Sequence, residues 1–169
     1  MAWVTPSNVV TGDVLTASTW NQDVVANTIA LPGGVLFHSG DITSSFATSA
    51  THTTYQTRTG MSGSVSYAAD RYLRVLTVLR LYPGGGLQGI KVQFRRGSTV
   101  IAQNFIDANQ LNAFSATAIV LEWVFVGPNA AASETFDVQI AAGLSNTAVN
   151  DAASATYPSF FYVEDCGAV

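Results

Sequence analysis

Residues 71–82 read RYLRVLTVLRLY and form the longest stretch of the chain with the character of a β-strand. Side chains alternate between the two faces of a strand, so odd- and even-numbered residues separate onto opposite faces. The even positions mix apolar residues with arginines, whereas most of the odd positions are aliphatic. This pattern predicts a central strand of a β-sandwich, with a consistently apolar face made of Leu73, Val75, Leu79 and Leu81.

Shorter segments of the same kind flank this strand on both sides. Upstream, residues 33–40 form a short apolar strand, and residues 51–58 have the residue types of a surface or edge strand. Downstream, Arg96 and Gly97 mark a hairpin turn in which the glycine supplies a positive φ. Alternating segments joined by Gly-, Pro- and Asn-rich turns predict an all-β fold, a single β-sandwich or jelly roll. The predicted downstream strands are residues 90–94, 98–106, 114–126, 135–143 and 159–169, separated by loops at 83–89, at 127–134 and, with polar composition, at 146–158.

The alternation also predicts which downstream residues share the inward face. Large apolar residues recur at every second position in three of the segments. On a strand this period places them on one side, where they can fill the space between two sheets. The predicted core residues are Ile90, Val92, Phe94, Ile119, Leu121, Trp123, Phe125, Phe136, Val138 and Ile140.

The first 32 residues have a different pattern from the rest of the chain. They begin as an extended arm, AWVTPSNVVTGDVL, and continue as TASTWNQDVVANTIAL, which has the apolar spacing of one short α-helix. Thr19 followed by Gln22 matches a capping box, and Pro32 with the glycines after it ends the helix. The chain therefore divides into an N-terminal arm and helix, residues 1–32, and a β-sandwich domain, residues 33–169.

The composition limits the classes of function. With 169 residues the chain makes one domain, and its single cysteine excludes an intrachain disulfide, as is usual for proteins of a reducing cytosol. The net charge of −4 disfavours nucleic-acid binding, and no apolar run approaches the ~18 residues of a membrane span. Charged residues make up 11% of the chain, against about 25% in typical domains. Either much of the surface meets other proteins, or the surface is simply rich in Ser and Thr.

Residues suited to catalysis or metal binding do not form a recognisable pattern. His38 and His52 each lack a second ligand at metal spacing, and no serine-nucleophile motif is present. Glu164 and Asp165 are adjacent, so on a strand their carboxylates point to opposite faces. The sequence predicts no enzyme activity, no cofactor and no metal site.

Six of the seven cationic residues gather in the middle of the chain. A hairpin could bring several of them to one side, where they would dock electrostatically onto an acidic neighbour. Alternatively they form a solvated sheet face, because each surface pair contributes only ~0–1 kcal/mol. These residues are Arg71, Arg74, Arg80, Lys91, Arg95 and Arg96.

Both ends of the chain resemble virion proteins of tailed bacteriophages. Many minor tail and head-surface proteins of these phages begin with a segment similar to TGDVLTASTWNQDVVANTIAL and end with one similar to FYVEDCGAV. The C-terminal segment departs from the family pattern at Cys166, where Ile is usual, and at Ala168, where Pro is usual. The central KVQFRRGSTVIAQN also resembles a hairpin of the family, and ASETFDVQIAA resembles one of its strands. The resemblance implies a non-enzymatic virion component with a β-sandwich, often a homotrimer, assembled in the cytoplasm of a bacterial host. The matching N-terminal residues are Gly12, Asp13, Leu15, Thr16, Ala17, Trp20, Asn21, Val24, Asn27 and Leu31.

These observations together predict a capsid decoration or minor capsid protein that binds other virion subunits. Residues 1–32 would attach it to its neighbours or hold a trimer together; alternatively, the helix folds back onto its own sandwich. The rival functions are a tail-tip or fibre subunit that binds host carbohydrate through exposed Tyr82, Tyr157 or Phe160, a cell-wall hydrolase, and a secreted β-sandwich module. The predicted docking residues are Trp3, Val14, Leu15, Trp20, Asn21, Val24 and Leu31.

Overall fold

The computed structural model of the chain describes residues 33–48, 53–83, 89–107, 111, 116–143 and 148–169. The predicted arm and helix, with all seven predicted docking residues, lie outside this part of the chain, as does His52. The described residues form strands and no helix, which confirms the all-β prediction. The strands are β1 (Gly34–His38), β2 (Phe46–Ala47), β3 (Gln56–Tyr67), β4 (Arg71–Pro83), β5 (Ile90–Arg96), β6 (Thr99–Ile106), β7 (Thr117–Val126), β8 (Ala132–Ala142), β9 (Val149–Asp151) and β10 (Phe160–Ala168).

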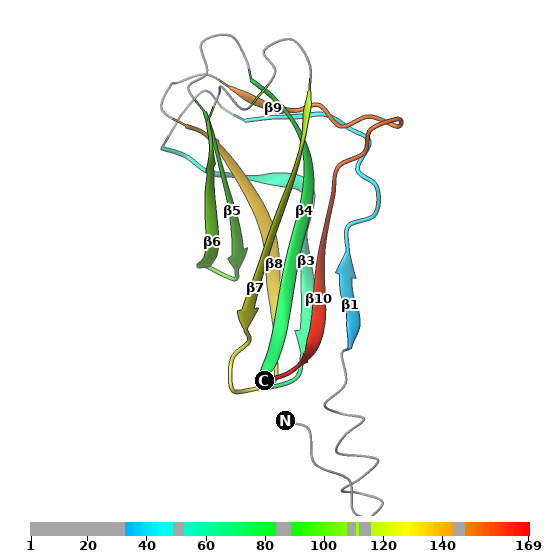
Figure 1. Cartoon of the computed structure of the whole chain (residues 1–169), viewed down its shortest axis with the longest axis vertical. Helices are drawn as coiled ribbons and strands as arrows, with labels where there is room; N and C mark the ends of the chain where they lie inside the picture. Colours follow the sequence, from blue (N-terminus) through cyan, green and yellow to red (C-terminus); the bar gives the residue numbers. More distant parts are fainter. Residues whose placement is uncertain (1–32, 49–52, 84–88, 108–110, 112–115, 144–147) are drawn as a thin grey trace, which may run out of the picture.

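The strands pair in the nested order of a jelly roll. β5 pairs with β6, β4 with β7, β3 with β8, and β1 with β10, every pair antiparallel. One sheet therefore has the order β1-β10-β4-β7, extended by the short β9 and β2, and the other has the order β3-β8-β5-β6. Figure 1 shows the two sheets as two layers, with both ends of β4 reaching the ends of the sandwich. The alternating apolar faces of the strands are buried between these layers.

The core is the one that the alternation predicts. Leu73, Val75, Leu79 and Leu81 of β4 are all completely buried. They face the apolar residues of β5 and β8 across the sandwich, where Phe94 stacks on Phe161 of β10 with ring centroids 6.1 Å apart. Burying each such side chain stabilises the fold by roughly 1.5–3 kcal/mol. Among the predicted core residues, Ile119 and Phe125 are only partly buried, and Trp123 departs most from the prediction, since 51% of its surface is exposed.

Two segments differ from their predicted structure. β3 does not end at Arg58 but continues to Tyr67, through a Ser- and Gly-rich stretch that lies outside the predicted strands. The serines of this stretch lie on the solvent side of an edge strand, while Met61 and Val65 face the core. The predicted polar loop at 146–158 contains the short strand β9, which pairs with both β2 and β4. In both segments, strand pairing and the burial of alternate residues outweigh the turn preference of the local composition.

The hairpin turn between β5 and β6 depends on Gly97, whose φ of 56° lies in the left-handed region. An alanine there would hold its Cβ close to the following carbonyl oxygen, at a cost of about 1–2 kcal/mol. We therefore expect Gly97→Ala to lower the free energy of unfolding by about 1 kcal/mol in urea denaturation, with no change in fold. Ser98→Ala, at the next position of the same turn, is the matched control. Equal stability of the two variants would contradict this account of the turn.

Candidate docking surface

The outer face of the β1-β10-β4-β7 sheet is rich in exposed apolar side chains. The even-numbered residues of β7 point away from the core, and Val120, Val124 and Val126 are 62%, 48% and 51% exposed. Tyr72, which pairs with Val126 in the neighbouring β4, is 40% exposed. A monomeric protein seldom leaves so many large apolar residues together in water, so this face has the character of a protein interface.

β7 is also an unprotected edge strand. It pairs only with β4, so the backbone along its other side has no strand partner among the described residues. Its sequence, TAIVLEWVFV, contains neither proline nor lysine and only one charged residue, Glu122. The edge strands β1 and β3 each carry an irregularity in their pairing, which is a common way of blocking the addition of a further strand. β7 lacks this protection and is therefore open to pairing with another chain.

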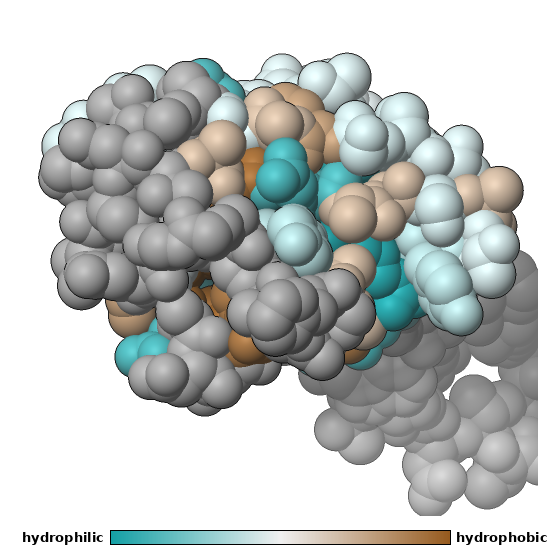
Figure 2. All heavy atoms as spheres, turned by 90° about the horizontal axis from the view of Figure 1, so that it is seen from above, coloured by the Kyte–Doolittle hydropathy of each residue, from teal (hydrophilic) through white to brown (hydrophobic). Residues whose placement is uncertain are grey.

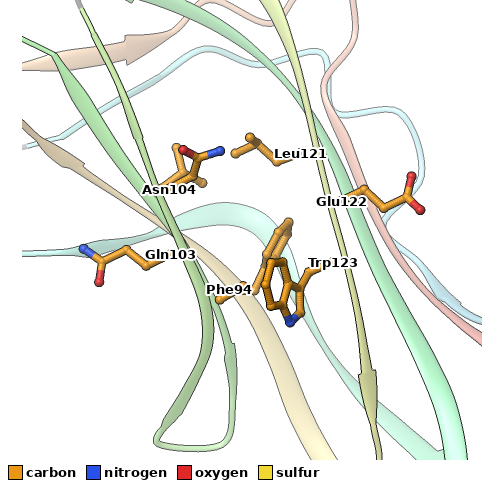
Figure 3. Close-up of a pocket in the computed structure, with 8 residues that line it drawn as sticks. Phe94, Gln103, Asn104, Leu121, Glu122 and Trp123 are labelled. Atoms are coloured by element: carbon orange, nitrogen blue, oxygen red, sulfur yellow. The ribbon is translucent and has the colours of Figure 1, made fainter.

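A cleft extends this surface around the edge of β7 into the side of the sandwich. It lies between β6 and β7, the edges of the two sheets, and has a volume of about 170 Å³. Phe94 and Trp123 both line this gap, and in Figure 3 Asn104 and Leu121 point toward one another across it. The exposure of Trp123 follows from this opening, because no strand of the described residues closes the gap between the sheets. We call Tyr72, Val120, Trp123, Val124 and Val126 together the β7 surface.

Charges on the outer face are neutralised within the sheet. The guanidinium of Arg74 lies 2.5 Å from a carboxylate oxygen of Glu164 on β10 and 3.7 Å from one of Glu122 on β7. Cys166 lies near this group and is exposed. The pKa of its thiol is raised, mainly by partial desolvation and next by the negative charge of the Glu164 carboxylate. When the charges of an apolar face are already paired with each other, covering the face costs little free energy of desolvation, which again favours a protein partner.

The described cationic residues do not form one positive patch, so the first of the two alternatives for the basic cluster, electrostatic docking by a single hairpin face, is not what the structure shows. Arg71, Arg74 and Arg80 lie on β4, whereas Lys91, Arg95 and Arg96 lie on β5 of the other sheet. Several of these arginines pair with carboxylates of adjacent strands. The N···O distances are 2.9 Å for Arg71–Asp165, 2.6 Å for Arg95–Asp137 and 3.1 Å for Arg96–Glu134. Pairing with carboxylates of adjacent strands neutralises most of the positive charge that is concentrated in this part of the sequence.

Among the described residues, one ion pair is fully buried, and it joins Arg58 of β3 to Asp151 of β9. Their side chains are 0% exposed, and the Arg58 Nε donates to an Asp151 oxygen over 2.6 Å. The other Asp151 oxygen accepts from the backbone N–H of Arg80 and from the Ser159 hydroxyl, each over 2.8 Å. Burying two charges costs several kcal/mol unless their hydrogen bonds are made, and here Asp151 makes three. The pair therefore fixes β3, β4 and β9 to the segment that precedes β10.

The other sequence-predicted residues show no catalytic or metal-binding arrangement in the described part of the chain. Glu164 and Asp165 lie on opposite faces, as predicted, each with its own arginine. His38 contacts the rings of Phe160 and Tyr162, and no group of His, Cys, Asp and Glu among the described residues could hold a metal ion. Nor do these residues include a helix with the length and apolarity required to span a bilayer.

Of the aromatic residues predicted to recognise carbohydrate, Tyr157 is the most accessible. It is 61% exposed, whereas Tyr82 and Phe160 are only partly exposed. Sequence reasoning predicted neither the uncovered face of β7 nor the cleft. One feature of the sequence could have indicated them: residues 119–126 are apolar at nearly every position, whereas a half-buried strand needs apolar residues only at alternate positions.

No family model matches the chain, and no curated protein matches it either. Solved structures with similar architecture include the infectious bursal disease virus VP2 subviral particle, at 11% identity over 82% of this chain and 38% of that one, with a TM-score of 0.45. They also include the Stig cyclase Fisc from Fischerella sp. TAU, at 11% identity over 68% of this chain and 61% of that one, with a TM-score of 0.38. A family 16 carbohydrate binding module matches at 13% identity, over 73% of this chain and 68% of the module, with a TM-score of 0.31. The chain thus spans less than two thirds of the virus protein and of the cyclase, and at these TM-scores the three likenesses carry no information on function.

Proposed function

We propose that this chain is a non-enzymatic structural protein of a tailed-phage virion, where it binds other virion subunits as a capsid decoration or minor capsid protein. The observation that carries the proposal is the β7 surface, a group of large apolar side chains along an unprotected edge strand. A large exposed apolar patch along an unprotected strand edge is typical of a surface that another protein covers. The resemblance of both chain ends to virion proteins of tailed phages supports the kind of partner.

The low charge of the chain supports the same reading. Of the described acidic residues, Glu122, Glu134, Asp137, Asp151, Glu164 and Asp165 pair with arginines, which leaves little free charge on the sheets. Interfaces between subunits are depleted in charged residues at their centre and enriched in aromatic ones. The jelly roll is an architecture that viral coats use, although it also occurs in lectins, so the argument rests on the surface and not on the fold.

We further propose that the protein forms a homotrimer in the particle. In this arrangement the edge of β7 and the cleft of one subunit would meet a different part of the next subunit, a heterologous contact that closes into a ring when the rotation between subunits is one third of a turn. The N-terminal segment, with Trp3 and Trp20, supplies large apolar side chains of the kind that anchor interfaces. An assembled ring would cover the β7 surface of every copy.

Quantitative mass spectrometry of purified particles tests this function. The copy number of the chain is measured relative to the major capsid protein. We expect a number that matches a class of symmetry positions on the capsid, as decoration or cementing requires. A number close to that of a single tail or fibre would favour the tail-tip alternative, and absence from the particle would overturn the structural proposal.

A further inference from the structure

A second pocket lies at the end of the sandwich where β4 finishes and β10 begins. It has a volume of about 460 Å³ and is lined by Arg80, Ala116, Ala118, Ala152 and Tyr157. The residues come from β4, the start of β7 and the segment between β9 and β10, which Figure 1 draws in orange at the upper end. Seen from this end, hydrophilic and apolar side chains of the described residues lie directly beside one another (Figure 2). Three alanines leave the wall of the pocket apolar, so its polar character comes from Arg80 and Tyr157.

Arg80 differs from the other arginines of the chain. Five of the six arginines pair with a carboxylate, and Arg80 is the one for which no described residue supplies one. Its Nε lies 3.4 Å from the carbonyl oxygen of Pro158, and its guanidinium lies 5.8 Å from the centre of the Tyr157 ring. A guanidinium offers five N–H donors, so Arg80 retains donors for a ligand. Its position over the tyrosine ring limits the directions in which they can point.

The loop that carries Tyr157 is held in place by its own hydrogen bonds. Ser154 and Tyr157 exchange two backbone hydrogen bonds of 3.1 Å, and the Tyr157 N–H also lies 3.2 Å from the Ser154 hydroxyl. The ring nevertheless remains 61% exposed, although nothing in this turn requires an aromatic residue. A large apolar ring held rigidly in water costs little entropy when it binds, and it is therefore a suitable platform for a ligand.

The buried network beneath the pocket fixes both of its functional residues. Asp151 accepts a hydrogen bond from the backbone of Arg80 and another from Ser159, two residues after Tyr157. The Ala152 N–H in turn donates to the Arg80 carbonyl oxygen over 2.7 Å. Binding sites need such support, because a site whose side chains are displaced by even ~1 Å binds its ligand much more weakly. Burying the charge of Asp151 costs desolvation free energy. In return, its hydrogen bonds hold the backbone of Arg80 and the segment that carries Tyr157 in place.

We propose that this pocket binds a saccharide unit that carries a carboxylate, such as a uronic or sialic acid. Arg80 would pair with the carboxylate, for which the planar fork of a guanidinium has the matching geometry. The Tyr157 ring would lie against the apolar face of the sugar ring, and the alanines would leave room for it. The carboxylates of an acidic peptide can also pair with Arg80, but Asp and Glu side chains offer no flat apolar face that would cover the exposed Tyr157 ring as the face of a sugar does. This binding activity is independent of the proposed assembly function, since the pocket and the β7 surface are separate groups of residues.

The test uses the full chain and ligand-observed saturation-transfer NMR with two acidic probes, methyl β-glucuronide and the methyl glycoside of N-acetylneuraminic acid. Methyl β-glucoside is the neutral probe of the same size. We expect at least one acidic probe to bind with a dissociation constant on the order of 1 mM, typical of so small a ligand. We expect Arg80→Gln and Tyr157→Ala each to weaken it about tenfold or more. Phe105→Ala, which removes an exposed ring on the opposite sheet, is the matched control and should bind like the unmodified chain.

Three outcomes would overturn the inference. The first is the absence of saturation transfer to either acidic probe at millimolar concentration. The second is binding that Tyr157→Ala leaves intact; this loop variant keeps all the contacts of Arg58 and Asp151, so it decides the question even if Arg80→Gln folds poorly. The third is Arg80-dependent binding of a short glutamate peptide without binding of the sugars, which would assign the pocket to a protein partner. None of these results bears on the copy number in the particle.

Discussion

Replacing Asp151 with alanine is expected to lower the free energy of unfolding by about 3–5 kcal/mol, the cost of breaking a buried ion pair by removing one partner. The change leaves the Arg58 guanidinium completely buried without its carboxylate. It also removes the acceptor of the Arg80 N–H and of the Ser159 hydroxyl. Each polar group buried without a partner costs about 1–3 kcal/mol. Urea denaturation followed by circular dichroism measures the change.

Two further variants test whether the loss of stability is specific to the buried pair or follows from breaking any ion pair of the sheets. Glu122→Gln breaks a pair that is 3.7 Å long and partly exposed, so it should cost no more than about 1 kcal/mol. The double variant Arg58→Met with Asp151→Leu removes both charges together and should recover much of the stability lost in Asp151→Ala. If Asp151→Ala were as mild as Glu122→Gln, the buried pair would not hold this end of the sandwich.

The sequence predicts the strands well because their signal is local. Apolar residues recur at every second position of β4, β5 and β8, and this period alone identifies Leu73, Val92 and Val138 as core residues. The hairpin turn at Gly97 is equally local, since a positive φ at one position requires a particular kind of residue. Each of these features is determined by residues that are neighbours in the chain.

The buried network has no such local signal. Arg58 and Asp151 are 93 positions apart, and each lies in a segment whose composition indicates a surface strand or a polar loop. Only the tertiary fold brings them together, because it places Arg58 of one sheet against Asp151 of the other. The basic cluster shows the converse, because residues close together in the sequence separate onto two sheets once β4 and β5 lie in different layers.

The β7 surface also depends on which strands are neighbours. The alternation of β7 predicts correctly that Leu121 faces inward, and by the same rule it predicts burial of Trp123. Whether an inward-facing residue is covered depends on the next strand in the sheet, and β7 has no strand beyond it among the described residues. The sequence therefore gives the direction of each side chain, while exposure follows from the topology.

The double variant Val120→Lys with Val124→Lys is expected to weaken self-association by about 100-fold or more, because it places two charges in the centre of an apolar interface. Both residues are already exposed on a folded subunit, at 62% and 48%, so the free energy of unfolding of the monomer should change by less than about 0.5 kcal/mol. Sedimentation over a range of concentrations measures the association. Ser64→Lys, on the outer face of the other sheet, is the matched control and should assemble normally.

The single cysteine reports on the same interface without a further mutation. Cys166 is exposed on β10 close to Arg74 and Glu164, on the outer face that assembly would cover. Its thiol should therefore react with a maleimide more slowly in the assembled protein than in the double lysine variant. Because the pKa of this thiol is raised, the comparison is best made at alkaline pH, where enough thiolate is present in both proteins. Equal labelling rates and an unchanged sedimentation profile would show that the β7 surface is not where the subunits meet, whereas slow labelling that the lysines accelerate would locate the contact on this face.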